Sequence, residues 1–585
     1  MNSEIKNCQS CKQEFKIELE DFSFYQKIKV PPPTFCPKCR NKRRMSWRNE
    51  RSLYKRVCDA TGKNIIAMFS PEEKLVVYDR DIWWKESFDP MTFGEEVDFK
   101  KPLFLQFREF FGKVPLPSLL NENVVNSSYC NCVHNTKNGY LLFASMETEN
   151  VSYSTRVIGA KDSLDLFGGF NQEKCYENVM CDRSQHLFFS ERSAECLDSF
   201  FLSDCRNLNS CIGCVNLRNV SYYIFNKPYS KEEYKKVLEN LDLGKYSNLS
   251  KFKSEFLNFK NALPRKYANI LRCQNVTGDN ITNSKNCRYC FDVYKELEDC
   301  AFATHSIGLR DGYDGYGFGD NAEQLYEVVD SGVNASNLLS TICVHECRNV
   351  AYCYNCHNSS NLFACSGLRN KSYCIFNKQY SKEEYEGLIP KIIEHMNNMP
   401  YADKQGRTYK YGEFFPQELS PFGYNETIAG EYFPLKEKES LEQGFRWRNT
   451  QKRDYQIEIQ PEDIPDDIKN IKEDIVGKVI ECAHKNKEDH TTGCEASCTE
   501  AFKITNEELK FYQQMNLPLP RFCPNCRHSG RLSQRNPMEL WHRQCMCDKA
   551  DHTHSGRCQV EFETSYSPER KEIIYCEECY QKEVY

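Results

Sequence analysis

The sequence lacks the segments that direct a chain into a membrane or out of the cell. It has no N-terminal basic stretch followed by an apolar one, and no apolar run of about eighteen residues. The 33 cysteines form an odd total, which argues against a complete disulfide framework. We therefore expect a cytoplasmic protein, with no membrane partner, whose cysteines stay reduced.

The common motifs of nucleotide-binding proteins and hydrolases are also missing. Neither GxxxxGK[ST] nor a strand-flanked GxGxxG is present, and there is no H-E-x-x-H or nucleophile elbow. The glycine-rich stretch at 312–320 is best read as a corner of a repeated fold. An enzyme, with carboxylates on an exposed face, is therefore the third of three hypotheses.

Neither sign of charge dominates the 585 residues, since the formal net charge is −6. A chain of this length is expected to divide into about three or four domains. Its cysteines fall into two sets. Fifteen lie in the end regions, largely in close pairs that suit a tetrahedral metal, and eighteen lie between Cys130 and Cys374, where we expect small buried hydrophobic side chains.

The two ends of the chain carry the same cysteine pattern, 487 residues apart. Cys11 corresponds to Cys498, and CPKCR at 36–40 corresponds to CPNCR at 523–527. The tight C-P-x-C turn directs two sulfurs at one point, and an earlier pair completes a structural zinc site. The expected ligands of two zincs are Cys8, Cys11, Cys36 and Cys39, then Cys494, Cys498, Cys523 and Cys526, with Cys482 as a substitute because Cys494-x3-Cys498 has one extra residue.

A second repeat follows each of these units. FSPEEKLVVY (69–78) matches YSPERKEIIY (566–575), which aligns Thr61, Asp79 and Ile82 with Cys558, Cys576 and Cys579, and Cys58 with Cys545 or Cys547. The N-terminal copy therefore cannot hold zinc alone. We expect a third zinc on Cys547, Cys558, Cys576 and Cys579, with Cys545, His552 and His554 as competitors for the place of Cys547, and about three zincs per chain. The two histidines are better explained as solvated loop residues.

The middle of the chain repeats about every twelve residues. A polar residue followed by an apolar or aromatic one recurs at Asn126, Asn138, Asn150, Asp162, Lys174, Gln185, Glu195, Asn207 and Asn219, and again from Asn286 to Asn370. This short period without helical spacing predicts a mainly β fold, a duplicated β-solenoid similar to a parallel β-helix. Ser230 and Ser381 each precede a glutamate by three residues, which predicts capping helices. A further metal at Cys353, Cys356 and His357 is the alternative to simple packing.

The expected organisation follows from these repeats. It is a zinc ribbon at 1–57, a degenerate ribbon and linker at 58–120, a first solenoid at 121–229, capping helices at 230–270, a second solenoid at 271–380, a capping helix at 381–400, a linker at 401–481, a zinc ribbon at 482–544 and a C-terminal zinc ribbon at 545–585. The C-x2-C, FY and C-P-x-C-R order resembles the small bacterial treble-clef or zinc-ribbon family, in which four cysteines hold a structural zinc. The whole order resembles a group of large bacterial zinc-ribbon proteins, which implies no activity.

Basic charge is concentrated beside the two C-P-x-C turns. Residues 36–56 carry a net charge of +8 and residues 521–538 a net charge of +4. Arginines beside a zinc site suit phosphate contacts, with Trp47 available for stacking, or they offset the charge of the zinc thiolates. The candidate nucleic-acid residues are Arg40, Arg43, Arg44, Arg48, Arg527 and Arg531. We therefore expect a non-enzymatic zinc protein that binds RNA or a ribonucleoprotein, with the solenoids as a rigid spacer. The alternative is a protein-protein scaffold.

Overall fold

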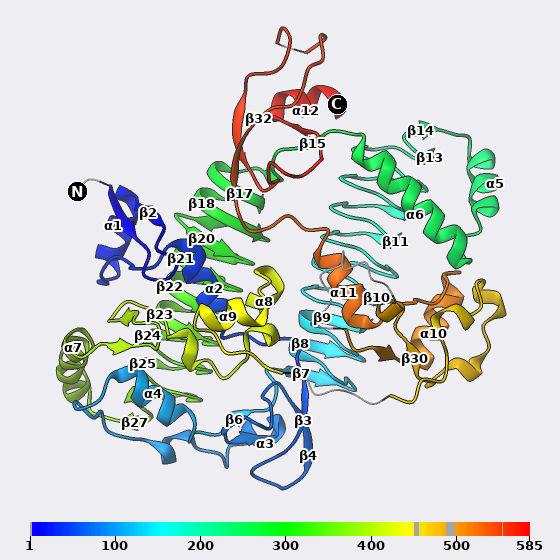
Figure 1. Cartoon of the computed structure of the whole chain (residues 1–585). Helices are drawn as coiled ribbons and strands as arrows, with labels where there is room; N and C mark the ends of the chain where they lie inside the picture. Colours follow the sequence, from blue (N-terminus) through cyan, green and yellow to red (C-terminus); the bar gives the residue numbers. More distant parts are fainter. Residues whose placement is uncertain (1–2, 450–454, 487–497, 553, 585) are drawn as a thin grey trace.

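Two ladders of parallel β-strands form the centre of the computed structural model, which describes residues 3–449, 455–486, 498–552 and 554–584. The first ladder runs from Glu122 to Ile224 and the second from Ile270 to Ile375. They lie side by side in Figure 1. The ring centroids of Phe170 and Tyr294, one from each ladder, are 5.3 Å apart.

The first ladder pairs residues that are twelve positions apart. Glu122 pairs with His134, and Gln185 pairs with Leu197, with single bridges at the same spacing between the named strands. Its strands are β7 (Glu122–Val125), β8 (Asn131–Lys137), β9 (Phe143–Ser152), β10 (Lys161–Leu164), β11 (Gln185–Phe188) and β12 (Leu197–Phe200). The predicted period of twelve residues is the register of this ladder.

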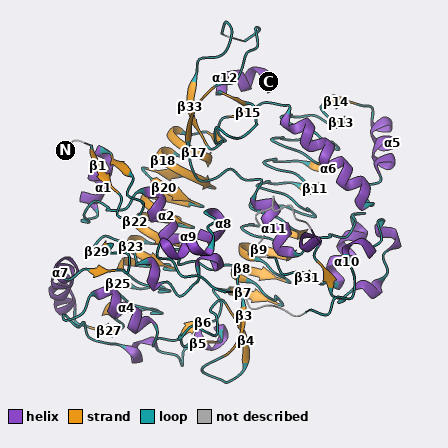
Figure 2. Ribbon diagram, viewed as in Figure 1, coloured by secondary structure: helices purple, strands orange, loops and turns teal. Residues whose placement is uncertain are grey.

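The second ladder is longer and less regular. Arg348 pairs with Ser360 twelve residues on, whereas Gln274 and Leu309 pair eleven and thirteen residues on. Its strands are β16 (Ile270–Leu271), β17 (Gln274–Thr282), β18 (Lys285–Val293), β19 (Leu297–Glu298), β20 (Ala301–Thr304), β21 (Ile307–Tyr316), β22 (Gly319–Val329), β23 (Ser336–Ile342), β24 (Arg348–Ala351), β25 (Ser360–Phe363) and β26 (Ser372–Ile375). Figure 2 shows how strongly strands and loops outweigh helices in both ladders, so the prediction of a mainly β fold is confirmed.

A left-handed backbone at every third residue shapes the first ladder. From Asn123 to Phe225 each third position has a positive φ, with glycine at 159, 168 and 213. Asn and Asp adopt this conformation at lower cost than other side chains, because their short polar groups bond locally. Asn126, Asn138 and Asn150 occupy such positions and are joined by amide hydrogen bonds of 2.7 and 2.8 Å. The polar series in the sequence therefore marks positive-φ corners, except at Gln185, where His186 takes that place.

The residue after most corners is buried, and mainly Ser, Cys, Val and Leu side chains fill these places. Cys196, Cys205, Cys211 and Cys214 are at most 2% exposed, as are Cys353, Cys356 and Cys365 in the second ladder. The prediction that these cysteines pack as small apolar groups is confirmed. Within the described residues, Cys353, Cys356 and His357 do not form a group that could hold a metal.

Each ladder ends in a short antiparallel hairpin and a helix. β13 (Tyr223–Ile224) pairs with β14 (Lys227–Pro228) before α5 (Lys231–Leu241) and α6 (Tyr246–Asn261), and β26 pairs with β27 (Lys378–Gln379) before α7 (Lys382–Asn398). Both predicted capping boxes are present, since Ser230 and Ser381 each accept a hydrogen bond from the backbone N–H of the glutamate three residues on. No helix in the described ranges has both the length and the apolar character needed to cross a membrane.

The remaining elements pack around the ladders. In α4 (Leu103–Phe111), the Phe111 ring lies 4.9 Å from Tyr354 of the second ladder. The others are α1 (Leu19–Lys27), β5 (Val77–Tyr78), β6 (Leu116–Pro117), β15 (Arg265–Lys266), β28 (Tyr401–Ala402), β29 (Thr408–Tyr409), α8 (Ile428–Tyr432), α9 (Glu437–Glu442), α10 (Asn506–Gln514) and β34 (Ile574–Tyr575). In Figure 1 α1 lies against the second ladder, and α10 lies beside the first.

Candidate metal centres

Four hairpin–helix units share one layout. Their hairpins and helices are β1 (Glu4–Asn7), β2 (Glu14–Ile17) and α2 (Pro37–Met45); β3 (Tyr54–Val57), β4 (Asn64–Ala67) and α3 (Arg80–Trp83); β30 (Ile480–Glu481), β31 (Ala501–Phe502) and α11 (Pro524–Leu532); and β32 (Trp541–Gln544), β33 (Glu561–Thr564) and α12 (Glu577–Val584). In each unit a cysteine directly follows the first strand. The helix begins directly after the third of the four ligand positions. That position is Cys36, Asp79, Cys523 and Cys576 in the four units.

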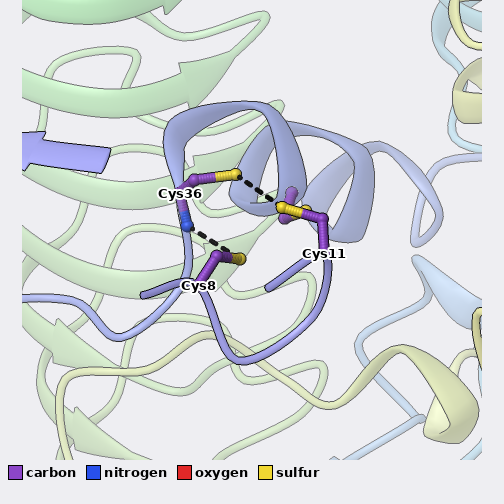
Figure 3. A group of neighbouring side chains, drawn as sticks. Cys8, Cys11 and Cys36 are labelled. Atoms are coloured by element: carbon purple, nitrogen blue, oxygen red, sulfur yellow. Dashed lines mark hydrogen bonds between the residues drawn. The ribbon is translucent and has the colours of Figure 1, made fainter. Parts of the chain in front are cut away.

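The first unit brings together all four of its predicted ligands, Cys8, Cys11, Cys36 and Cys39. The Cys11 and Cys36 sulfurs are 3.7 Å apart, and Figure 3 shows them converging with Cys8. Sulfurs around one tetrahedral zinc lie about 3.8 Å apart, because each Zn–S bond is about 2.3 Å long. The backbone N–H of Cys36 donates to the Cys8 sulfur at 3.2 Å. Hydrogen bonds from Cys36 and Cys39 lower the pKa of Cys8, which favours the thiolate that binds metal.

The second group consists of Cys482, Cys498, Cys523 and Cys526. Three sulfur–sulfur distances in it are 3.4, 3.7 and 4.0 Å. Cys482 follows β30 as Cys8 follows β1, and its sulfur likewise accepts the N–H of the third cysteine, Cys523, at 3.2 Å. The predicted ligand Cys494 lies outside the described residues. Among the described residues, the substitute Cys482 completes this group.

The third group consists of Cys545, Cys558, Cys576 and Cys579, all buried. The Cys545 sulfur accepts the N–H of Cys576 at 3.2 Å, which is the contact that Cys8 and Cys482 make in their units. The choice of Cys547 as the first ligand here is therefore replaced by its competitor Cys545. Cys547 instead lies with His552, His554 and Cys579 in a fourth group that could hold a metal.

The unit formed by β3, β4 and α3 keeps the layout without the ligands. The Cys58 sulfur accepts the N–H of Asp79 at 3.2 Å, so Cys58 corresponds to Cys545 and not to Cys547. Thr61, Asp79 and Ile82 occupy the other three positions, as the sequence alignment predicted. Within the described ranges, Cys58 belongs to no group that could hold a metal.

The six predicted nucleic-acid arginines are buried in ion pairs, and none is more than 6% exposed. Both Arg40 and Arg44 bind Asp314 of the second ladder, at 2.8 and 3.1 Å. Arg43 binds Glu327 at 2.8 Å and Glu413 at 2.9 Å. Burial raises the pKa of Glu327, while Arg44 and Arg43 oppose that rise. This network therefore balances three arginines against three carboxylates.

The other three arginines are paired in the same way. Arg48 contacts Asp330 and Glu50. At the C-terminal unit, Arg527 and Arg531 both bind Asp165 of the first ladder, at 3.1 and 2.7 Å. These six residues were predicted to contact phosphate, but the structure encloses their charged groups in ion pairs and does not place them at the surface. Trp47 is also buried, at 2% exposure. Counting charge along the sequence missed the acidic partners, which lie in distant parts of the chain.

The cysteine groups at both ends are compatible with zinc-ribbon-like modules, and each set of four thiolates suits a structural zinc. A search against protein-family models and a search of curated proteins both gave no match, so the resemblance to zinc ribbons rests on these residues and their geometry.

Proposed function

We propose that this protein is a non-enzymatic scaffold in which zinc-ribbon modules hold two β-solenoids side by side and leave the solenoid surfaces free for a protein partner. The solenoid assignment is supported by the parallel twelve-residue register, the corner at every third position and the small inward-facing side chains. Sites with four protein thiolates leave no open position for a reacting water, which supports a structural role for the metal.

The observation that carries this proposal is the crossed docking of the two ends. The N-terminal helix α2 sends Arg40 and Arg44 to Asp314 of the second ladder, whereas the C-terminal helix α11 sends Arg527 and Arg531 to Asp165 of the first. Both aspartates are fully buried. Each end of the chain therefore binds the ladder that is more distant in sequence. It also contacts the nearer one, through Glu50 with Arg156 at the N-terminal end and Arg535 with Asp292 at the C-terminal end.

Aromatic contacts repeat this arrangement. Phe24 stacks on Tyr313 of the second ladder with ring centroids 3.9 Å apart, and Tyr512 meets Tyr176 of the first ladder edge-on at 5.5 Å. Phe24 and Phe511, and Tyr25 and Tyr512, are equivalent in the duplicated sequence. Because a zinc-bound turn fixes each helix that bears these arginines, the metal sites would set the spacing of the ladders.

The ion pairing of the arginine and lysine side chains supports a protein partner over RNA. The arginines beside the C-P-x-C turns are used inside the protein. Along the ladder surface, Lys137, Arg183 and Arg310 each pair with a carboxylate on a neighbouring turn, at distances of 2.9 to 3.1 Å. Paired cations of this kind attract phosphate less than free ones do.

Affinity purification of the tagged chain with and without nuclease tests this proposal. We expect the same protein to be recovered in both samples, and to bind the chain again after both components are purified. If the partner protein is no longer recovered after nuclease treatment, the chain binds RNA or a ribonucleoprotein instead.

A further inference from the structure

Two groups of metal-ligand side chains near the C-terminus share one sulfur. Cys579 lies within 4.8 Å of Cys545, Cys558 and Cys576 on one side, and of Cys547, His552 and His554 on the other. The first group repeats the zinc-ribbon layout of the other units. Among the residues that the structure describes in those units, the second group has no counterpart.

The distances within the second group suit ligands of a single ion. The Cys547 sulfur is 3.1 Å from Nδ1 of His552, and the Cys579 sulfur is 3.4 Å from Nε2 of His554. A sulfur and an imidazole nitrogen on the same tetrahedral zinc are about 3.5 Å apart, from bonds of about 2.3 and 2.0–2.1 Å. Two thiolates and two imidazoles are a common structural zinc set.

The other nitrogen of His554 makes the contact that is typical of a metal-binding histidine. Nδ1 of His554 lies 2.7 Å from the carbonyl oxygen of Gly556. Nδ1 therefore carries the proton and donates it to that carbonyl, which leaves the lone pair of Nε2 directed toward Cys579. Metal-ligating histidines are regularly held in this way by a backbone carbonyl.

All the additional ligands lie in one enlarged loop. The step from the first to the second cysteine is three residues from Cys8 to Cys11 but thirteen from Cys545 to Cys558. Cys547, His552 and His554 all fall within this step. The loop thus adds three ligands beside a complete set of four without displacing any of them.

We propose that this loop holds a second zinc ion and that the Cys579 thiolate bridges it to the first, forming a two-metal centre. Five thiolates and two Zn²⁺ ions carry a net charge of −1, whereas one ion on four thiolates carries −2. The second ion therefore lowers the uncompensated charge of a site whose cysteines are all buried. The chain then holds four zincs, one more than the zinc-ribbon units alone provide.

Zinc content of the purified full-length chain tests this proposal. We expect four zincs in the wild type and three in both His552→Ala/His554→Ala and Cys547→Ser, because these substitutions leave Cys545, Cys558, Cys576 and Cys579 in place. His186→Ala is the matched control, since His186 pairs with Asp198 on the first ladder, and it should keep four. Three zincs in the wild type, or four in both loop variants, would overturn the second site.

The bridge is tested separately by replacing zinc with cobalt. Two Co²⁺ ions joined by a thiolate couple magnetically, so the wild type should give less paramagnetic resonance signal per cobalt than Cys547→Ser, which retains only isolated ions. An equal signal per cobalt in the two proteins would show that Cys579 does not bridge.

Discussion

Arg44 and Asp314 form a buried ion pair at 3.1 Å, although they are 270 residues apart in the sequence. Arg531 and Asp165 form its counterpart at 2.7 Å, across 366 residues. Each arginine lies on the helix that follows a cysteine turn, and each aspartate lies at a positive-φ corner of a ladder. The two ends of the chain thus use one duplicated contact to hold two related ladders.

Replacing Asp314 with Asn should strongly destabilise the chain. Arg40 and Arg44 would keep their buried positive charges and lose their shared carboxylate, a loss that costs about 3–5 kcal/mol in buried pairs. Chemical denaturation measures the change. Asp311→Asn is the control, because Asp311 pairs with Lys27, whose side chain is 44% exposed, and such pairs contribute at most about 1 kcal/mol. Similar losses in the two variants would contradict the buried network.

Cys482→Ser should remove one zinc from the chain, and Cys494→Ser should leave the zinc content unchanged. Cys482 lies with Cys498, Cys523 and Cys526, and its sulfur accepts the same backbone hydrogen bond as that of Cys8. Elemental analysis of the two purified variants decides between them. If Cys494→Ser loses the zinc and Cys482→Ser keeps it, then the short spacing from Cys494 to Cys498 identifies the ligand and Cys482 is not one.

The degenerate unit should gain a zinc when its missing ligands are restored. Thr61→Cys, Asp79→Cys and Ile82→Cys together place three thiols at the positions of Cys558, Cys576 and Cys579, beside a Cys58 sulfur that already faces residue 79. We expect one additional zinc per chain. Adding Cys58→Ser to the triple variant should remove it again, and an unchanged zinc content in the triple variant would show that the unit has lost the geometry as well as the ligands.

RNA affinity should show little dependence on salt. Contacts from three arginines to phosphate would give a slope of roughly two to three in a plot of log affinity against log salt concentration. Because Arg43, Arg44 and Arg48 are buried in ion pairs, we expect a slope near zero from fluorescence anisotropy with a labelled RNA. A steep slope that falls by about one unit in Arg43→Gln would show that the arginines reach phosphate in another conformation.

The sequence predicted those parts of the structure that depend on local chemistry. Ligand spacing and the C-P-x-C turn are local features, so they identified Cys8, Cys11, Cys36 and Cys39. The polar series could be identified because Asn and Asp tolerate the left-handed corners. Cys482 was only a substitute, because sixteen residues separate it from Cys498 where three separate Cys8 from Cys11. Cys482 directly follows a strand, as Cys8 and Cys545 do. This position was the signal that would have identified Cys482 as a ligand.

The role of the arginines could not be predicted in this way. Local charge around Arg44 is strongly positive, but its partners Asp314 and Glu327 come from the second ladder and are brought to it only by the fold. Burial, which decides whether a cation meets phosphate or carboxylate, is not visible in a local charge count.

Hydrogen exchange in two zinc-site variants tests the crossed docking most directly. Cys36→Ser loosens the helix that carries Arg40 and Arg44, and Cys523→Ser loosens the helix that carries Arg527 and Arg531. We expect Cys36→Ser to speed amide exchange in β21 and β22 of the second ladder, and Cys523→Ser to speed it around Asp165 in the first. Faster exchange in the opposite ladder for each variant, or in neither ladder, would contradict the account.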